Sequence, residues 1–237
     1  MKSYRYLTST IIAGALMVCS AEAQGFLSLN FSSTPGSTIQ FNGAASSFQF
    51  NSSTLPIFGG IFSGTQWQIG SQTGGTGSAT GLLGWVNNSP FSYGPITTVV
   101  NVSGIDQTAN VLGAPGALVI NDGSGFNLTG NVNWGQISTH DFAGAINAAL
   151  SVNITDLSYS GSNADLLTFI SSGPAALNLT FQFSPGQTLT DLTTGAGAFQ
   201  TSYSGSLSVV PEPTSIGCFA LGLGVLAIVR RFKHQRQ

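Results

Sequence analysis

The sequence contains almost no positive charge, because its few lysine and arginine residues lie only at the two ends. None occurs between Tyr6 and Val229. The central segment carries one histidine, His140, and six aspartates: Asp106, Asp122, Asp141, Asp156, Asp165 and Asp191. An acidic domain without lysine or arginine repels nucleic acids and anionic lipid surfaces. This composition argues against any nucleic-acid-binding function.

Cysteine is also scarce. The two cysteines, Cys19 and Cys218, lie in apolar stretches near the two ends, so the segment between Gln24 and Val210 can form no disulfide. That segment spans 187 residues, which is the length of one domain and enough to bury a sizeable core. Its stability must come from apolar packing and from hydrogen bonds.

Residues that commonly carry catalysis are missing from this segment. Without lysine it can form neither a phosphate-binding P-loop nor a Schiff base, and without cysteine it has no thiol nucleophile. A serine triad would need His140, but no G-x-S-x-G motif accompanies it. One histidine cannot build a zinc site of several histidines. We therefore expect a non-enzymatic protein without cofactor or metal, and a hydrolase that uses an aspartate pair is the alternative.

The N-terminus has the layout of a secretory signal peptide. Two basic residues precede an apolar core from Leu7 to Val18, and Ala21 and Ala23 form a small-x-small cleavage motif. We expect cleavage after Ala23, which removes residues 1–23. A chain lipidated at Cys19 and an uncleaved N-terminal helix are the alternatives.

The C-terminus joins three elements: the triplet Pro211-Glu212-Pro213, an apolar run from Ile216 to Val229, and a basic cluster that begins at Arg230. As a helix, the run covers roughly 21 Å, against a hydrocarbon core of about 30 Å. Basic residues stay on the cytoplasmic side, so the triplet would face the exported side. Residues 214–232 are therefore expected to hold the chain in the inner membrane only transiently.

This order of elements resembles the PEP-CTERM sorting signal, with the match confined to Val210–Arg236. The resemblance implies a Gram-negative, exopolysaccharide-producing host and an exosortase-like membrane enzyme that cuts near the triplet. The residues that carry the resemblance are Pro211, Glu212, Pro213, Arg230 and Arg231. A plain single-span anchor is the alternative. The expected organisation is a signal peptide (1–23), an exported domain (24–208) and a sorting signal (209–237).

Alternating apolar and polar residues dominate the central domain. In "FNLTGNVNW" one face carries Phe126, Leu128, Val132 and Trp134, and the other carries asparagine and threonine. "ALNLTFQFS" and "FQTSYSGSLSV" keep the same period of two, which is typical of strands with one buried and one wet face. We predict an all-β fold, an antiparallel β-sandwich of jelly-roll or Ig-like outline, with a β-solenoid as the alternative.

Little helix is expected inside the domain. The segment Asn163–Ser171 fits one short helix, because Ser162 can cap it and its apolar residues share a face. The sequence "NDGSG" at 121–125 predicts a hairpin turn. The glycine-rich segment at 71–81 is expected to be a flexible loop.

Two residues stand out as candidate ligand contacts. Trp85 lies beside asparagines and could stack on a sugar ring, and packing in the core or at an edge is the alternative. Asp122 could give an oxygen ligand to calcium, and a plain turn is the alternative. Trp67 and Trp134 are in phase with apolar neighbours and are expected in the core.

The sequence thus favours a structural protein over an enzyme. We expect an exported protein of the cell surface or extracellular matrix, whose asparagine-, threonine- and serine-rich faces contact exopolysaccharide. A discrete carbohydrate- or calcium-binding module built around Trp85 or Asp122 is the alternative.

The first prediction concerns the C-terminal triplet. Proline on both sides of Glu212 keeps this backbone extended, in a shape that a processing enzyme can grip. In the native host, the mature protein should lack the basic end, and a chain with Pro211-Glu212-Pro213 replaced by three alanines should keep it and stay in the membrane fraction. Intact mass of both proteins is the measurement. A wild-type chain that retains its last residues in the membrane would instead be an ordinary anchored protein.

Overall fold

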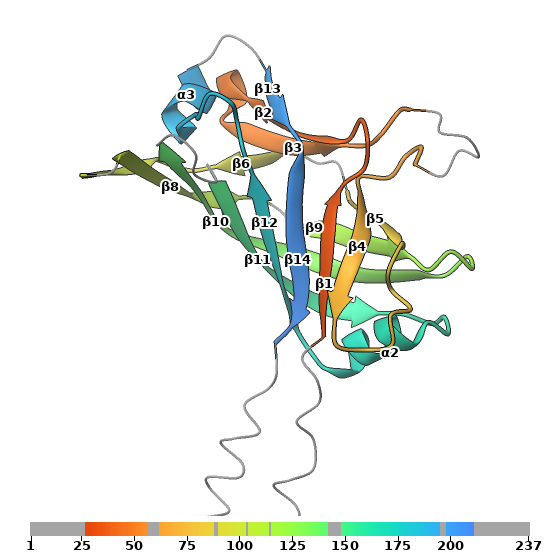
Figure 1. Ribbon diagram of the computed structural model, residues 1–237. Helices are drawn as coiled ribbons and strands as arrows, with labels where there is room; N and C mark the ends of the chain where they lie inside the picture. The colour runs from red at the N-terminus through yellow and green to blue at the C-terminus, as the bar shows by residue number, and fades with distance from the viewer. Residues whose placement is uncertain are drawn as a thin grey trace, which may run out of the picture. The chain divides into compact units, whose positions relative to one another are not determined.

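The described part of the chain consists mostly of antiparallel strands, as the period of two predicts (Figure 1). The computed structural model describes residues 27–55, 62–87, 90–102, 104–113, 115–141, 148–194 and 198–210. The predicted signal peptide and the sorting signal from Pro211 onward lie outside these residues. Within the described ranges, no helix is long and apolar enough to cross a membrane.

Eight strands close into a barrel, so the predicted sandwich and the solenoid alternative are both wrong. Hydrogen-bonded neighbours follow one another in the order β11, β12, β14, β1, β4, β5, β9 and β10, and the ring closes where β10 pairs with β11. The barrel strands are β1 (Ser28–Ser33), β4 (Trp67–Thr73), β5 (Leu83–Val86), β9 (Gly116–Asn121), β10 (Asn127–Asp141), β11 (Ala148–Ser158), β12 (Ala175–Phe181) and β14 (Tyr203–Val209). A barrel and a sandwich both bury one face of each strand, and the alternation alone does not distinguish them.

A second sheet branches from the barrel at β10. The first half of β10 pairs with β9, and residues from Gln136 onward pair with β8. The pairing of β10 with β11 shifts register between Trp134 and Ile137, close to the branch. From β8 the sheet continues through β6, β3 and β2 to β13, and β7 adds to β8. These strands are β2 (Thr38–Asn42), β3 (Ser47–Asn51), β6 (Phe91–Tyr93), β7 (Thr97–Asn101), β8 (Gly104–Leu112) and β13 (Ala198–Thr201).

Aromatic rings fill the space between the second sheet and the barrel. Phe50 of β3 stacks on Trp134 of β10, with ring centroids 5.8 Å apart and planes inclined by 17°. Phe41 of β2 lies 5.2 Å from Phe181 of β12, and Phe50 lies 5.2 Å from Tyr203 of β14. Such pairs add to the stabilisation that burial of the rings provides. The second sheet therefore shares one apolar core with the barrel.

Two short α-helices occur in the described ranges, where one was predicted. Helix α2 (Ala164–Ser171) lies at the end of the barrel opposite the second sheet, and α3 (Leu189–Thr194), which was not predicted, lies beside that sheet (Figure 1). A 3-10 turn, η1 (Gly43–Ala45), joins β2 to β3. The predicted cap of α2 is wrong by one residue, because the side chain of Asn163 accepts the first backbone N–H groups and Ser162 does not.

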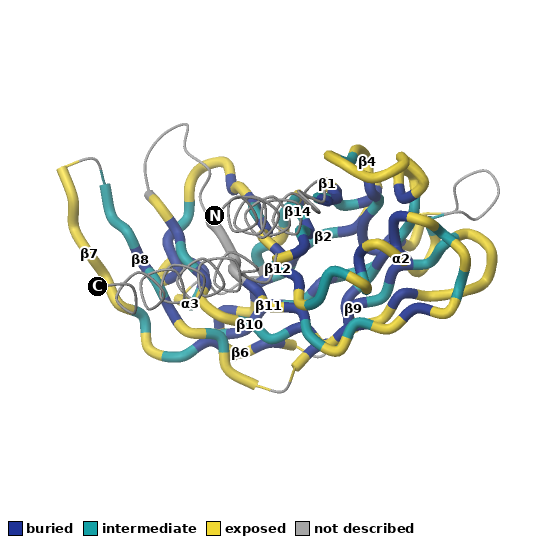
Figure 2. Tube along the Cα trace, turned by 90° about the horizontal axis from the view of Figure 1, so that it is seen from below, coloured by how far each residue is buried: buried dark blue, intermediate teal, exposed yellow. Residues whose placement is uncertain are grey.

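Burial alternates along the strands, with inward residues of all barrel strands meeting in one core (Figure 2). Trp67 is buried as expected, and Trp134 is half-buried and packs against the core. The segment "FQTSYSGSLSV" divides at Ser202 into β13 of the second sheet and β14 of the barrel. A continuous sequence pattern thus contributes to two different sheets.

Close packing in the barrel requires glycine at position 84. Gly84 of β5 lies directly opposite Trp67 of β4, and the indole ring covers it. A Cβ atom at this position would lie 2.1 Å from the nearest ring carbon. Trp67 would therefore have to move, although it sits inside a filled core.

We expect the substitution Gly84→Ala to lower the free energy of unfolding by about 1–3 kcal/mol, because overpacking forces side chains and backbone apart. Gly70→Ala on β4 is the control, since an added Cβ there meets nothing within 4 Å. Its effect should stay within about 0.5 kcal/mol. Urea unfolding of the three proteins is the measurement, and equal stability of both variants would contradict the packing described here.

Candidate functional site

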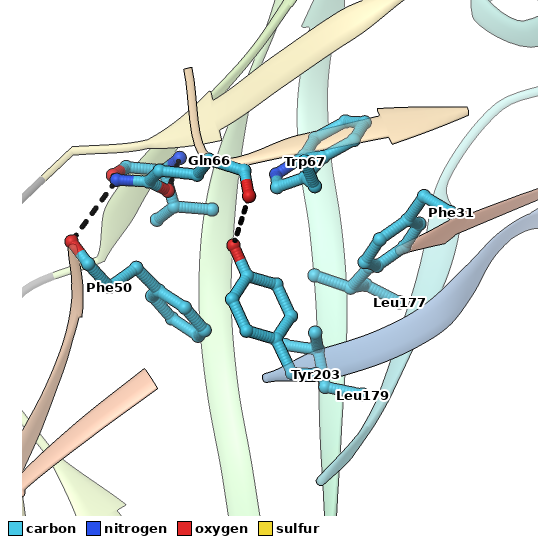
Figure 3. Close-up of a pocket in the computed structure, with 8 residues that line it drawn as sticks. Phe31, Phe50, Gln66, Trp67, Leu177, Leu179 and Tyr203 are labelled. Atoms are coloured by element: carbon cyan, nitrogen blue, oxygen red, sulfur yellow. Dashed lines mark hydrogen bonds between the residues drawn. The ribbon is translucent and has the colours of Figure 1, made fainter. Parts of the chain in front are cut away.

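The interior of the barrel is filled by side chains. Figure 3 shows Phe31, Trp67, Leu177 and Tyr203 around a residual cavity of about 10 Å³. A space of that size holds at most one water molecule. This region of the interior is therefore a packed core, and a ligand site has to be sought on the outside.

Gln66, which is 1% exposed, bonds to two strands through its side-chain amide and to a third through its backbone carbonyl (Figure 3). Its Nε2 donates to the carbonyl oxygens of Phe50 (3.2 Å) and Val86 (2.9 Å), and its Oε1 accepts from the Val86 backbone N–H (2.7 Å). The hydroxyl of Tyr203 donates to the Gln66 carbonyl at 3.0 Å. Burial raises the pKa of Tyr203, so its hydroxyl stays protonated and can donate. Gln66 thus has a structural role.

The outer face of β1, β14 and β12 is lined by uncharged polar side chains. Ser32, Ser204 and Thr180 lie side by side across the three strands and form one row. Thr180 and Ser204 contact each other through their hydroxyl oxygens at 3.2 Å. A second row, two residues along each strand, contains Asn30, Ser206 and Asn178. We call these six residues the hydroxyl face.

These side chains point outward because their neighbours point into the core. Leu29 and Phe31 alternate with Asn30 and Ser32 on β1, and Leu177, Leu179 and Phe181 alternate with the polar residues of β12. In a strand, successive side chains lie on opposite faces. The apolar half of the sequence pattern fills the barrel, and the polar half therefore forms its surface.

A groove of about 510 Å³ opens at one end of the hydroxyl face. Its lining consists of Ser32, Ser33, Thr180, Phe181, Gln182, Ser202, Tyr203 and Ser204. Phe181 and Tyr203 are buried, and the other six lining side chains carry hydroxyl or amide groups that a ligand could meet. Hydroxyls donate and accept, and the amide does both. The groove can form many neutral hydrogen bonds and offers neither a nucleophile with its base nor a charge.

Trp85 and Asp122, the two candidate ligand contacts predicted from the sequence, lie away from this groove and do not form a common site with it. Trp85 is half-buried on β5, which β4 separates from β1. Asp122 lies in the turn between β9 and β10, where its Oδ1 accepts the backbone N–H groups of Ser124 (2.7 Å) and Phe126 (3.0 Å). Its Oδ2 accepts the hydroxyl of Tyr159 at 2.8 Å. The hairpin predicted from "NDGSG" is confirmed, and both carboxylate oxygens of Asp122 bind donors of the protein itself.

Each of the other aspartates with a described side chain contacts a partner within the protein. Asp106 contacts His140, with Oδ1 and Nδ1 2.6 Å apart, and Asp156 accepts from Asn131 at 2.7 Å. Asp191 accepts the backbone N–H of Thr188 at 2.9 Å, at the start of α3. Among the described residues, no group of three or more histidine, cysteine, aspartate or glutamate side chains could hold a metal ion.

Asp165 carries the most heavily bonded carboxylate, and sequence reasoning missed its role. Although α2 itself is exposed on one side, Asp165 is fully buried. Its oxygens accept the backbone N–H groups of Thr76 (2.6 Å) and Ala79 (3.1 Å) and the hydroxyls of Thr76 (3.1 Å) and Ser78 (2.9 Å). The segment 71–81, predicted to be a flexible loop, is thus bonded to the start of α2. The serines and threonines in this segment were the available signal.

The protonation state of Asp165 follows from this environment. Burial tends to raise the pKa of the carboxyl, but hydrogen bonds from Thr76, Gln72, Ser78 and Ala79 outweigh burial and lower the pKa to about 2. The carboxylate is therefore ionised at neutral pH without any cation beside it. Since its bonds attach α2 to the 71–81 segment, Asp165 is a structural residue.

Comparison of the chain with protein-family models, with curated proteins and with solved structures found no match. The candidate site therefore stands on its own geometry.

We expect Asp165→Asn to lower the free energy of unfolding at pH 7 by about 2 kcal/mol, because the lowered pKa of Asp165 means that the folded state favours the ionised carboxylate, which asparagine lacks. The folded-state pKa lies below the unfolded value of about 4. The contribution is therefore complete above pH 4 and disappears as the pH falls toward 2. The stability difference between wild type and variant should shrink over that interval.

Chemical denaturation at several pH values measures this difference. Asp156→Asn, an exposed aspartate on β11, is the control and should change stability by less than about 0.5 kcal/mol. A wild-type advantage over Asp165→Asn that persists unchanged at pH 2 would contradict the role given to the ionised carboxylate.

Proposed function

We propose that the protein is a non-enzymatic, exported component of the cell surface or extracellular matrix whose barrel contacts neutral polysaccharide through the hydroxyl face. The observation that carries this proposal is the uncharged groove of about 510 Å³, whose lining residues other than the buried Phe181 and Tyr203 are serine, threonine and glutamine. Its volume lies in the range of about 300–1,000 Å³ that is typical of small-molecule sites.

Chemical complementarity supports a glycan as the ligand. Sugar hydroxyls both donate and accept hydrogen bonds, and so do the hydroxyls of Ser32, Ser204 and Thr180. One such bond contributes only about 0.5–1.5 kcal/mol, so useful affinity requires several contacts along a chain. The two rows of the hydroxyl face offer repeated contacts, which suit a polymer better than a single sugar.

Electrostatics supports a neutral rather than an acidic polymer. The charged residues between Gln24 and Val210 are six aspartates, with no lysine or arginine to attract a carboxylate or sulfate. Uniformly acidic proteins repel anions over about 8–10 Å at physiological salt. Binding to a neutral polymer involves no such repulsion and should depend little on ionic strength.

The resemblance of the C-terminal tail to a PEP-CTERM signal supports export. In this scheme, residues 214–232 hold the chain in the inner membrane, an exosortase-like enzyme cuts near Pro211-Glu212-Pro213, and the domain moves to the surface or into exopolysaccharide. In this proposal, the C-terminal tail directs export and the hydroxyl face binds the polysaccharide.

A second candidate is a discrete carbohydrate-binding module centred on Trp85. The specific observation in its favour is that this indole faces outward from β5 and is partly exposed, next to the exposed Asn87. Sugar rings stack on such aromatic surfaces. The two candidates place the glycan on different strands, so one set of variants distinguishes them.

The double variant Thr180→Val/Ser204→Ala should bind neutral exopolysaccharide from the host at least about fivefold more weakly, because it removes two neighbouring hydroxyls. Affinity electrophoresis of the purified chain in gels containing the polymer is the measurement. Thr129→Val/Ser158→Ala is the matched control, since these residues form a directly opposed threonine–serine pair on β10 and β11.

The control variant should migrate like the wild type, and raising the salt to about 500 mM should leave the wild-type retardation unchanged. Loss of binding in Trp85→Ala, with the hydroxyl-face variant unaffected, would favour the second candidate. No retardation of the wild type by any neutral polymer would contradict both.

A further inference from the structure

Strand β7 forms an uncovered edge of the sheet. It pairs with β8 from Thr97 opposite Thr108 to Asn101 opposite Gly104, and within the described residues nothing pairs with its other side. Figure 2 shows β7 as the outermost strand of the domain, next to β8. Its outer backbone N–H and C=O groups are therefore available to another strand.

Exposed apolar side chains lie next to one another on this edge. All five residues of β7 are exposed, and two of them are apolar: Val99 is 53% exposed and Val100 is 77% exposed. Val102, directly after the strand, is also exposed. The hydroxyl face, in contrast, consists of serine, threonine and asparagine. Exposed β-branched apolar residues on an edge strand favour pairing with a further strand.

The features that normally protect a sheet edge are missing here. Edge strands of monomeric proteins carry lysine, proline, bulges or inward-pointing charges. The sequence "TTVVN" of β7 has no charge and no proline, and its pairing with β8 is regular throughout. The nearest carboxylate, Asp106 on β8, is engaged with Asn101 and His140.

We propose that β7 pairs antiparallel with β7 of a second copy of this chain, about a two-fold axis through Val99. In this register Val99 lies opposite Val99 of the partner copy, Thr98 opposite Val100, and Thr97 opposite Asn101. Val99 gains an apolar neighbour directly opposite, Val100 packs against Thr98 of the partner copy, and the two domains share one continuous sheet. Antiparallel pairing about a two-fold axis is a closed, self-complementary contact.

Charge repulsion does not oppose the pairing of two copies at this edge, although the domain is acidic. The row that contains Val99 continues to Asp106 on β8 and to His140 on β10. In the dimer, the Asp106 carboxylates of the two copies are separated by three strand spacings of about 4.8 Å, or roughly 14 Å. That exceeds the screening length of about 8 Å at physiological salt, and His140 lies beside each carboxylate.

The other uncovered edge within the described residues is β13, at the far end of the second sheet. Pairing of β7 with β13 of another copy would be head-to-tail and would produce open chains instead of a closed dimer. Strand β13 is shorter and presents Gln200 rather than valine to solvent. The apolar self-match of β7 therefore favours the closed dimer.

Analytical ultracentrifugation of the purified full chain tests this inference. We expect a concentration-dependent monomer–dimer equilibrium, and Val99→Lys should raise the dissociation constant at least tenfold, since it places two like charges opposite each other across the axis. Leu167→Lys is the control, because Leu167 is an exposed apolar residue of α2, far from β7, and should leave the equilibrium unchanged.

A second measurement remains informative even if Val99→Lys alters folding. In a chain with Cys19 and Cys218 replaced by serine, Val99→Cys should form disulfide-linked dimers on mild oxidation, and Phe126→Cys, at an exposed turn, should not. A wild-type chain that stays monomeric, a dimer that survives Val99→Lys, or larger assemblies abolished by Gln200→Lys would each overturn the two-fold pairing. A monomeric variant that still binds polysaccharide would leave the proposed function intact, so failure of the dimer can be distinguished from failure of the proposed function.

Discussion

The described domain has to satisfy its buried polar groups without a single lysine or arginine, and this constraint explains much of its structure. A buried carboxylate usually needs a cation, but Asp165 is held by two backbone N–H groups and two hydroxyls. Gln66 and Gln107 likewise join neighbouring elements through hydrogen bonds of their side-chain amides. Gln107 joins β8 to Thr98 of β7 and to Thr190 of α3, by bonds of 3.1 and 2.8 Å. Hydrogen bonds from neutral donors thus take the place of lysine and arginine where these elements meet.

This constraint also determines where a ligand can act. The apolar residues that alternation directs inward are large enough to fill the barrel around Trp67 and Tyr203, so no space for a ligand remains there. What remains for recognition is the wet side of the strands, where serine, threonine and asparagine recur at strand spacing. In the proposed function, this surface binds extended, neutral polymers weakly and at many points. Pairing through β7 would join two such surfaces, and two linked weak sites hold a polymer more tightly than either alone.

The sequence was sufficient to predict the all-β class, the hairpin at 121–125 and a short helix near Leu166, because these depend on local periodicity and turn chemistry. It was not sufficient to distinguish a barrel from a sandwich, since that depends on the pairing of β10 with β11 and on β1 lying between β14 and β4. The role of Asp165 was hidden for a similar reason. Its partners Thr76 and Ser78 lie almost ninety positions away in the chain, and nothing local links them. The hydroxyl face combines residues from three strands and could be recognised only after their register was known.

The pairing of the first and last barrel strands has a consequence for the order of folding. Ser28 of β1 lies opposite Ser208 of β14, and the backbone N–H of Val209 bonds to the carbonyl of Leu27 at 3.3 Å. The barrel therefore cannot close until the last strand has been made, however early β1 emerges. During synthesis, the chain must wait with β1 lacking its neighbour β14. Closure then joins segments at opposite ends of the domain, which makes folding slow; in the proposed export, a chain whose barrel has not yet closed can still pass through a translocation pore.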